Sequence, residues 1–558
     1  MIWATNFSES FFSFSKIIMG FMIMIITYNA LTLNKKQTYI AFIISCVIVL
    51  IVYVVAGIWQ YLHITDTSFT ELYDISGING HKNLLSAMLF LLSSFLLTVI
   101  PYLKNRFAKI IPIAIYTLSL IFVVLLKSRA TIIGYIISIL FFVIIVLLHK
   151  KNIVIKHKYK VIISALAVII TFVFFTVILR KASSSIIEKS SEGSQTEYNI
   201  LSASSMYERL ALWDNTYKLS DQKPFLGCGL GNWKIDMPSV GTLNLYRSDV
   251  WNINFVRPHN EFLGILSECG YITLLIYLIF LCLIIVFSLF AICELKNMKD
   301  FILGAVSLSI FVGANFISMF DFPNERIEFI IWINIIIGIL YVMLTKNKST
   351  KGLNYLFLIL SVLFSVIGFY RYIGEYYTYD MQQAIKIRDF NSTIKYSQKS
   401  ISPLFNIDPI GYPIQWYKGH ALMMKGDIRA KYSLRKAYID APYCKQNLND
   451  LGFVTYYEDH DLELAEYYLR LSMKISPNYF YSGLNLAEIF VNEGEYNKAR
   501  MVLDLMYTDE EKRDMLLKDA QFYAPDNLEY EISRIMYDYD TRMRLQQRVD
   551  SLRLQFVE

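Results

Sequence analysis

Hydrophobic residues are gathered into long, uninterrupted runs over roughly the first two thirds of this chain and are dispersed over the last third. Each run in residues 10–372 is close to the ~20 residues that an α-helix needs to cross the hydrocarbon core of a bilayer. Residues 373–558 instead mix charged and apolar positions, as soluble helical proteins do. Ten membrane spans are predicted, at 11–32, 38–59, 83–102, 107–126, 130–149, 159–180, 260–292, 301–320, 327–345 and 352–372.

These patterns predict an all-α protein of two parts. A polytopic membrane helix bundle occupies residues 1–372, and a soluble helical domain occupies residues 373–558. The composition agrees, because 55% of the residues are hydrophobic, which is high for a soluble domain. The net charge of +6 is modest, and its distribution along the chain is more informative than its size.

Basic residues lie in alternate connections between the predicted spans. Because Lys and Arg are enriched in cytoplasmic connections, these five connections are predicted to share the cytoplasmic side. They carry Lys35 and Lys36; Lys104, Arg106 and Lys109; Lys150, Lys151, Lys156, Lys158 and Lys160; Lys296 and Lys299; and Lys346, Lys348 and Lys351. The other side then holds the N-terminus, the connections 60–82, 127–129, 181–259 and 321–326, and everything after residue 372. One missed or surplus span would instead put the C-terminal domain in the cytoplasm.

The connection over residues 181–259 is far longer than two neighbouring helices require. Connections of this length are usually functional or disordered, and its content of Trp, Tyr, Leu and Gly favours an ordered structure. Within it, Met206, Leu210, Trp213 and Tyr217 recur at helical spacing and predict an amphipathic helix lying on the membrane or on the bundle. The glycine-rich stretch 227–231 lacks the spacing of a nucleotide-binding loop and is interpreted as a tight turn.

The C-terminal domain has small residues and prolines at a regular spacing. Gly419, Gly452 and Ala487 stand 33 and 35 residues apart, and Pro442 and Pro477 stand 35 apart. This pattern resembles the tetratricopeptide repeat, and it predicts three repeats with a degenerate fourth over residues 376–403. Such a domain is either a structural cap on the membrane domain or a concave surface for a protein or glycan partner, and the fold alone does not decide between them.

Seven cationic side chains are predicted on the outer side: Lys82, Lys127, Arg129, Arg209, Arg247, Arg257 and Arg326. Arg129 stands at the mouth of a span, where charge is costly and usually functional, although an interfacial arginine can also simply snorkel to the headgroups. Arg209 lies beside the apolar stripe of its helix, where a plain surface charge is the alternative. His259 lies at a predicted helix start, where free N–H groups and the helix dipole favour anions. It is either a general base for an acceptor hydroxyl or a hydrogen-bonded interfacial histidine.

Carboxylate pairs with the spacing of a metal site are missing from the outer face of the predicted membrane domain. A pyrophosphate leaving group must be neutralised by a metal or by fixed cations, and cations are what this face offers. The sequence therefore predicts a metal-independent reaction that needs no cofactor. The chain carries no P-loop, and membrane lipids rather than nucleic acid are the expected surroundings.

Four motifs follow one another between residues 80 and 270. They are Gly80-His-Lys-Asn83; Ser128-Arg-Ala130; Tyr207-Glu-Arg-Leu-Ala-Leu-Trp213 with Pro224-Phe-Leu-Gly-Cys-Gly-Leu-Gly-Asn232 downstream; and His259-Asn-Glu-Phe-Leu263 with Glu268-Cys-Gly270. In this order they resemble the superfamily of O-antigen ligases, O-antigen polymerases and protein O-oligosaccharyltransferases. The resemblance implies a membrane bundle of the C-type glycosyltransferase kind, and it does not extend to the tetratricopeptide part.

The resemblance implies transfer of a glycan from undecaprenyl pyrophosphate to an acceptor hydroxyl on the periplasmic face of a bacterial inner membrane. Carried over onto this chain, Arg129 and Arg209 would hold the pyrophosphate, and His259 would activate the acceptor hydroxyl. Four further cations rank second, as additional phosphate or sugar contacts: Lys82, Arg247, Arg257 and Arg326. His81 and Lys82 depart from the more usual polar, neutral residues of the first motif, which leaves the role of that segment open.

The acceptor stays open at this level. Ligation to lipid A-core is the leading prediction, with chain polymerisation and transfer to a protein as alternatives. A repeat domain on the outer side raises the protein alternative, because protein acceptors need a docking surface. A transporter for lipid-linked sugar would carry charges buried within its spans, and the predicted spans are nearly free of them. A non-catalytic scaffold built on the repeats would leave the cation-bearing loop unexplained.

Overall fold

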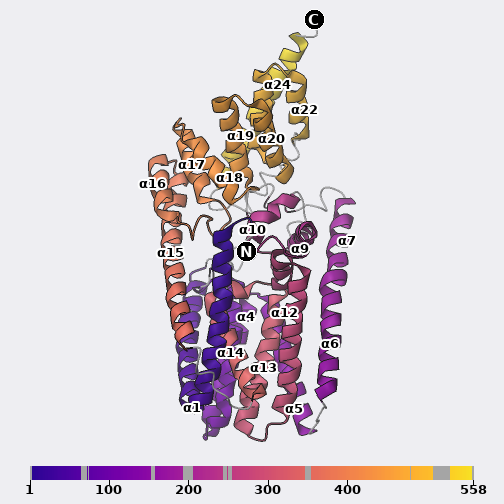
Figure 1. Cartoon of the computed structure of the whole chain (residues 1–558), viewed down its shortest axis with the longest axis vertical. Helices are drawn as coiled ribbons and strands as arrows, with labels where there is room; N and C mark the ends of the chain where they lie inside the picture. The colour runs from indigo at the N-terminus through magenta and orange to yellow at the C-terminus, as the bar shows by residue number, and fades with distance from the viewer. Residues whose placement is uncertain are drawn as a thin grey trace.

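A computed structural model describes residues 3–64, 72, 75–78, 80–151, 157–192, 205–242, 245, 248, 254–345, 354–477, 479–506 and 528–555. Over these residues the secondary structure is helical, apart from two isolated β-bridges in the C-terminal domain. The helices form a bundle of long, nearly parallel rods, with a second group of shorter helices rising from one end of it (Figure 1). The predicted all-α class is confirmed.

The bundle contains the predicted spans. Its helices are α1 (Phe7–Tyr61), α3 (Lys82–Leu96) with η1 (Leu97–Tyr102), α4 (Arg106–Leu125), α5 (Arg129–Lys150), α6 (His157–Val173) with η2 (Phe174–Ile178) and α7 (Leu179–Glu192), α12 (Glu261–Cys293), α13 (Met298–Ser318), α14 (Ile327–Leu344) and α15 (Asn354–Lys386). Within the described residues, eight helices are long and apolar enough to cross a membrane. The first nine predicted spans coincide with these eight helices to within about five residues at each end, and the tenth corresponds to α15.

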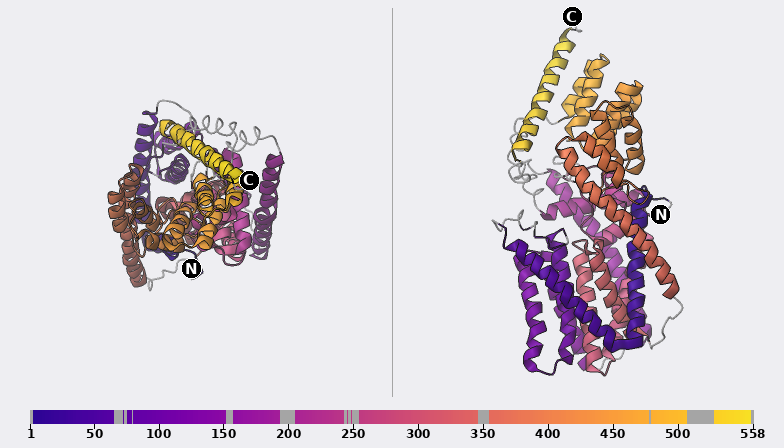
Figure 2. Two further views of the ribbon diagram at one scale, coloured as in Figure 1. Left: turned by 90° about the horizontal axis from the view of Figure 1, so that it is seen from above. Right: turned by 90° about the vertical axis from the view of Figure 1, so that its left-hand side faces the viewer.

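Nine spans fit into eight helices because α1 supplies two of them. Its 55 residues correspond to about 80 Å of helix, which is more than twice the thickness of the hydrocarbon core. Asn34 has φ −148° and ψ 78°, which breaks the helix near its middle. The second half of α1 then runs back obliquely along the bundle (Figure 2).

Four of the five predicted basic connections meet at one end of the bundle, while Lys156 and the fifth connection, with Lys346, Lys348 and Lys351, lie outside the described residues. Lys35, next to the break in α1, forms an ion pair of 2.5 Å with Asp300 at the start of α13. Lys160 near the start of α6 forms an ion pair of 3.5 Å with Glu294, which follows α12. The C-terminal helices rise from the opposite end (Figure 1). This arrangement is the one that the alternation of basic connections predicts.

The long outer connection folds into α9 (Ser205–Gln222), α10 (Trp233–Asp236) and η3 (Met237–Val240). Of the two predicted placements of α9, the one on the bundle is observed, but the predicted amphipathic stripe is wrong. Leu210, Trp213 and Tyr217 are buried, but so are the residues between them, and Met206, the first residue of the proposed stripe, is exposed. α9 packs against α7 and α12, and it is therefore a core element of this end of the protein.

A break in α12 positions the glycine-rich turn. Gly270 has φ 83° and interrupts the helix after its first nine residues. The backbone of residues 224–229 bonds to this break: the Cys228 N–H donates to the Ser267 carbonyl, and the Tyr271 N–H donates to the Pro224 carbonyl, both at 2.9 Å. Stretch 227–231 is thus the predicted tight turn, with positive φ at its three glycines. It locks the first turns of α12 to the end of α9.

Substituting Gly270 with alanine should destabilise the protein by about 1–3 kcal/mol, because an L-residue is strained at this φ. A Cβ atom would also overlap the carbonyl oxygen of Phe225. Thermal unfolding of the purified protein measures this loss. Gly368→Ala is the matched control, since a Cβ at this helical position meets nothing within 4 Å. Equal melting temperatures for the two variants would contradict the proposed packing.

The C-terminal domain consists of successively packed helices. They are α16 (Phe390–Ser400), α17 (Ile414–Met424), α18 (Ala430–Asp440), α19 (Lys445–Asp459), α20 (Leu462–Ile475), α21 (Phe480–Asn492), α22 (Tyr496–Leu505) and α24 (Leu528–Gln555). The predicted small residues lie where two helices touch: a Cβ at Gly419 would come within 2.7 Å of Leu434, and one at Gly452 within 2.7 Å of Leu469. These helix pairs are what the repeat pattern predicts, while the tetratricopeptide assignment itself stays a prediction.

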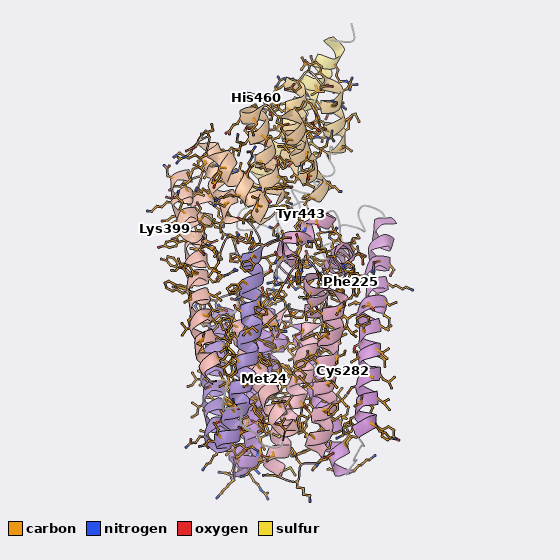
Figure 3. All side chains as sticks on the ribbon, in the orientation of Figure 1. Met24, Phe225, Cys282, Lys399, Tyr443 and His460 are labelled. Atoms are coloured by element: carbon orange, nitrogen blue, oxygen red, sulfur yellow. The ribbon has the colours of Figure 1, made fainter. Side chains whose placement is uncertain are left out.

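Buried polar contacts join this domain to the bundle. Glu9 near the start of α1 forms ion pairs with Lys234 of α10 (3.1 Å) and with Arg371 of α15 (2.6 Å). The Lys445 ammonium donates to the Ser248 carbonyl (2.6 Å), which links the repeat helices to the outer connection. Tyr443 lies at this junction, whereas His460 lies on the far part of the domain (Figure 3). The C-terminal domain is therefore anchored directly above the end of the bundle that carries the predicted site.

Candidate functional site

The predicted site residues converge at the end of the bundle below the C-terminal domain. α3 begins there with Lys82, whose side chain is only 1% exposed, and Lys82 lies within electrostatic range of Lys127 and Arg129 at the start of α5. The N-cap of α3 is His81. Its ring lies within electrostatic range of Arg209 on α9. Two arginines that are 80 residues apart in the chain are thus gathered around the start of one helix.

His81 is a partly buried histidine at the centre of this group. Burial lowers its pKa, because the charged ring is poorly solvated there, and the carboxylate of Asp321 opposes this effect. Three cations add to the lowering: Lys82, Arg209 and Arg326. The Nδ1 atom of His81 accepts a hydrogen bond from the Asn83 N–H at 3.2 Å. The neutral ring is therefore the favoured form.

His259 is held in a strained position just before α12. It has φ 53°, the left-handed conformation that side chains other than Gly rarely adopt and that is commonest at functional sites. The preceding carbonyl, of Pro258, accepts a hydrogen bond from the Trp213 indole at 2.9 Å, which ties His259 to the helix that carries Arg209. Its Nδ1 atom lies 3.9 Å from the Asp321 carboxylate.

The ring of Phe322 lies near the rings of both histidines. The ring of Phe322 meets His259 edge-on at 4.8 Å and lies 6.4 Å from the ring of His81. Asp321 and Phe322 belong to the short connection between α13 and α14. This connection therefore faces both imidazoles, with the carboxylate of Asp321 and with the ring of Phe322.

The start of α12 is not the anion-binding helix end that the sequence suggests. The side chain of Asn260, the N-cap, accepts hydrogen bonds from the N–H groups of Phe262 (3.0 Å) and Leu263 (3.1 Å). These two donors are therefore occupied by the cap and are not free for an anionic ligand.

The arginines of this end fall into two groups. Within the described part of the chain, Arg129, Arg209 and Arg326 form no ion pair with a carboxylate. Arg257 is ion-paired with both Glu268 (3.5 Å) and Glu325. The first group is available to an anionic ligand, while Arg257 is already neutralised. Arg247 lies outside the described residues.

The ion pairs of Arg257 build the support under the site. Burial alone would raise the pKa of Glu325, but the charges of Arg257 and Lys16 outweigh it and hold this pKa well below its usual range. Lys16 of α1 bonds to Glu325 at 2.9 Å. The connection that carries Asp321 is thereby tied to α1 and to the segment before His259. We assign Arg257 a structural role rather than a contact with phosphate or sugar.

Asp321, Phe322 and His81 are the members of the site that sequence reasoning missed. His81 stands in the first motif, and Asp321 lies at the end of a span in an outer connection. The signal for Asp321 was its position directly after a predicted span, on a face that is rich in cations. Within the described residues, no group of three His, Cys, Asp or Glu side chains is arranged to hold a metal ion.

Residues 114–278 match the family model described as O-antigen ligase. This segment is related to the O-antigen ligases. It includes Arg129, Arg209 and His259, whereas His81 and Asp321 lie outside the matched residues and reach the site through the fold. The O-antigen ligase match supports a multi-pass membrane enzyme of the glycosyltransferase type that acts on a lipid-linked glycan. Comparisons with curated proteins and with solved structures found no significant match.

Proposed function

We propose that this protein transfers a glycan from undecaprenyl pyrophosphate to an acceptor hydroxyl at the periplasmic face of the membrane, with lipid A-core as the acceptor. One observation carries the proposal: three arginines without a carboxylate partner among the described residues lie near the start of α3, with Arg209 and Arg326 in electrostatic range of His81 and Arg129 in range of Lys82. Asp321 links this cluster to His259, because its carboxylate acts on His81 and lies 3.9 Å from the His259 ring. A cationic cluster with a histidine suits an anionic leaving group beside a hydroxyl nucleophile.

The donor's pyrophosphate would be bound by the guanidinium groups of Arg129 and Arg209. Guanidinium forms charge-assisted, bidentate hydrogen bonds to phosphate oxygens, and here it would stabilise the negative charge that develops as the leaving group departs. Lys82 and Arg326 would add positive charge to the same cluster of cations. Since these cations already provide fixed positive charge, the proposed reaction uses no metal.

His259 would act as the general base. In the proposed step the acceptor oxygen bonds to the anomeric carbon of the donor, the bond between that carbon and the pyrophosphate oxygen breaks, and the hydroxyl proton passes to the imidazole. Undecaprenyl pyrophosphate leaves with the bonding electron pair. Asp321 would act as a positioning residue, because its carboxylate faces Nδ1 at 3.9 Å and would stabilise the protonated ring.

A protein acceptor is the second candidate. It is favoured by the repeat helices, which are bonded to the outer connection through Lys445 and Ser248, directly above the site. A deletion strain distinguishes the candidates by which surface molecule loses its glycan. Loss of long-chain lipopolysaccharide supports ligation to lipid A-core, and loss of glycan from proteins supports a protein acceptor. A strain in which all surface glycans keep their amount and length would contradict both.

The C-terminal domain is expected in the periplasm, because the basic connections share the opposite end of the bundle. A phosphatase reporter, which is active only in the periplasm, should be active when it is fused after residue 400. The same reporter fused after Lys151, at the basic end, is the matched control and should be inactive. The reverse result would overturn the orientation and, with it, the periplasmic site.

Transfer should continue in excess EDTA, because fixed arginines supply the charge that a divalent cation supplies in other enzymes. The measurement is turnover of the purified protein with its lipid-linked donor, before and after chelation. Activity that is lost with EDTA and restored specifically by magnesium or manganese would contradict this prediction.

A further inference from the structure

A cavity of about 520 Å³ lies in the half of the bundle that is remote from the candidate active site. It is lined by residues of α3, η1, α4, α5 and α13. Its rim includes Ile113 on α4 and Ile139 on α5, which are 48% and 44% exposed, whereas Ile310 on α13 forms a fully buried floor. The cavity therefore opens sideways through the apolar outer surface of the bundle, where acyl chains surround the protein.

The lining of this cavity is almost entirely apolar. It consists largely of aliphatic and aromatic side chains, among them Leu97, Ile100, Phe142, Ile302 and Val306. The volume falls within the roughly 300–1,000 Å³ that is usual for sites that bind small molecules. An extended hydrocarbon chain that enters from the side is the ligand chemistry that fits such a lining.

Cations flank the cavity at its polar end. Lys109 lines it directly, one turn into α4. Lys299 follows Met298, another lining residue, and its ammonium lies over the Tyr102 ring at 4.8 Å. Lys104 and Arg106 stand in the same region, just before and at the start of α4.

This charge is not neutralised by the protein itself. Within the described residues, none of Lys104, Arg106, Lys109 and Lys299 forms an ion pair with a carboxylate. Asp300, which follows Lys299 in the sequence, forms an ion pair with Lys35 at 2.5 Å. An apolar recess between membrane helices with uncompensated cations at its headgroup end is typical of sites for anionic lipids.

We propose that this cavity binds an acyl chain of an anionic phospholipid whose phosphate is held by Lys109 and Lys299. The lipid would fill the space between the α4–α5 pair and α13, and so would stabilise the packing of these helices. The proposal does not depend on the proposed function, because it concerns the opposite end of the bundle and a different ligand.

The donor's polyprenyl chain is a less suitable occupant. Lys109 and Leu125 are sixteen residues apart on α4, which corresponds to about 24 Å. The donor's pyrophosphate, bound by the arginines at the other end, cannot also use Lys109. Only a lipid whose headgroup lies in the leaflet at the basic end satisfies both the apolar lining and the cations.

Native mass spectrometry of the full chain in detergent tests the proposal, with phosphatidylglycerol and phosphatidylcholine of identical acyl chains as probes. Phosphatidylglycerol should be retained preferentially and should raise the melting temperature. Lys109→Gln should weaken its binding about fivefold, the usual effect of one cation near an anionic headgroup. Lys151→Gln, a change of the same type at the same end but outside the cavity, should leave binding unchanged.

A second pair of variants tests the cavity itself. Ile139→Trp should fill the rim and abolish retention, while Ile144→Trp, on the same helix and 47% exposed but outside the cavity, should have no effect. If Ile139→Trp does not fold, Ile113→Trp fills the rim from α4. Equal retention of the two phospholipids, or binding insensitive to Lys109→Gln and to both rim variants, would overturn the proposal. Displacement of phosphatidylglycerol by undecaprenyl phosphate would also overturn it, in favour of the donor chain.

Discussion

Replacing His259 with alanine should lower turnover by roughly 10²- to 10⁴-fold, the usual contribution of a positioned general base. The measurement is glycan transfer by the purified protein, together with donor affinity measured separately. Donor affinity should stay nearly unchanged, because the arginines rather than the imidazole are proposed to hold the pyrophosphate. Transfer should also fall in acid, since a protonated ring cannot accept the hydroxyl proton.

Two comparisons make this result specific to the base. His63→Ala removes another histidine, which is exposed just after α1 and bonds to the Trp59 carbonyl (2.7 Å), and should leave turnover unchanged. Asp321→Asn keeps the shape of the positioning residue and removes its charge, so that it should lower turnover less than His259→Ala and alter its pH profile. If donor affinity collapses in proportion to turnover in His259→Ala, the imidazole is a phosphate ligand and not a base.

Arg129→Ala and Arg209→Ala should each reduce turnover by about 10²- to 10³-fold, the usual loss when one donor to a developing anion is removed. Lysine should substitute poorly at both positions, because an ammonium group cannot reproduce the bidentate geometry of guanidinium. Folding should be preserved, since neither arginine forms an ion pair with a carboxylate among the described residues. Turnover, donor affinity and melting temperature of the four variants test this expectation.

Two other arginines of the same end serve as controls. Arg180 is ion-paired with Asp221 (2.6 Å) and half exposed, so that Arg180→Ala should leave transfer intact. Arg257→Ala should act on stability instead, at a cost on the order of 3–5 kcal/mol, because it removes the cationic partner of Glu268 and one of the two cations paired with Glu325. Near-normal turnover in Arg129→Ala or Arg209→Ala would indicate that the residue is an interfacial charge and does not bind the donor.

Hydropathy predicted the membrane helices well because the bilayer imposes one length and one polarity on each of them. The helix pairs of the C-terminal domain were predictable for a related reason: Gly419 and Gly452 must be small where two helices touch, and that need recurs at the repeat period. The core position of α9 was not predictable, because residues 210–217 are buried on every face of the helix, against α7, α12 and η3, and leave no single apolar stripe to detect.

The amino-acid sequence was sufficient for the helical class and the membrane spans, and it predicted a two-part organisation and three leading site residues, Arg129, Arg209 and His259. These properties depend on local hydropathy or on short motifs, which can be recognised without knowing what lies nearby in space. Only the tertiary structure decided which cations are available to a ligand and which are neutralised, as Arg257 is by Glu268 and Glu325. It alone brought Asp321 to His259, because ion pairs and electrostatic proximity join residues that are tens to hundreds of positions apart in the chain.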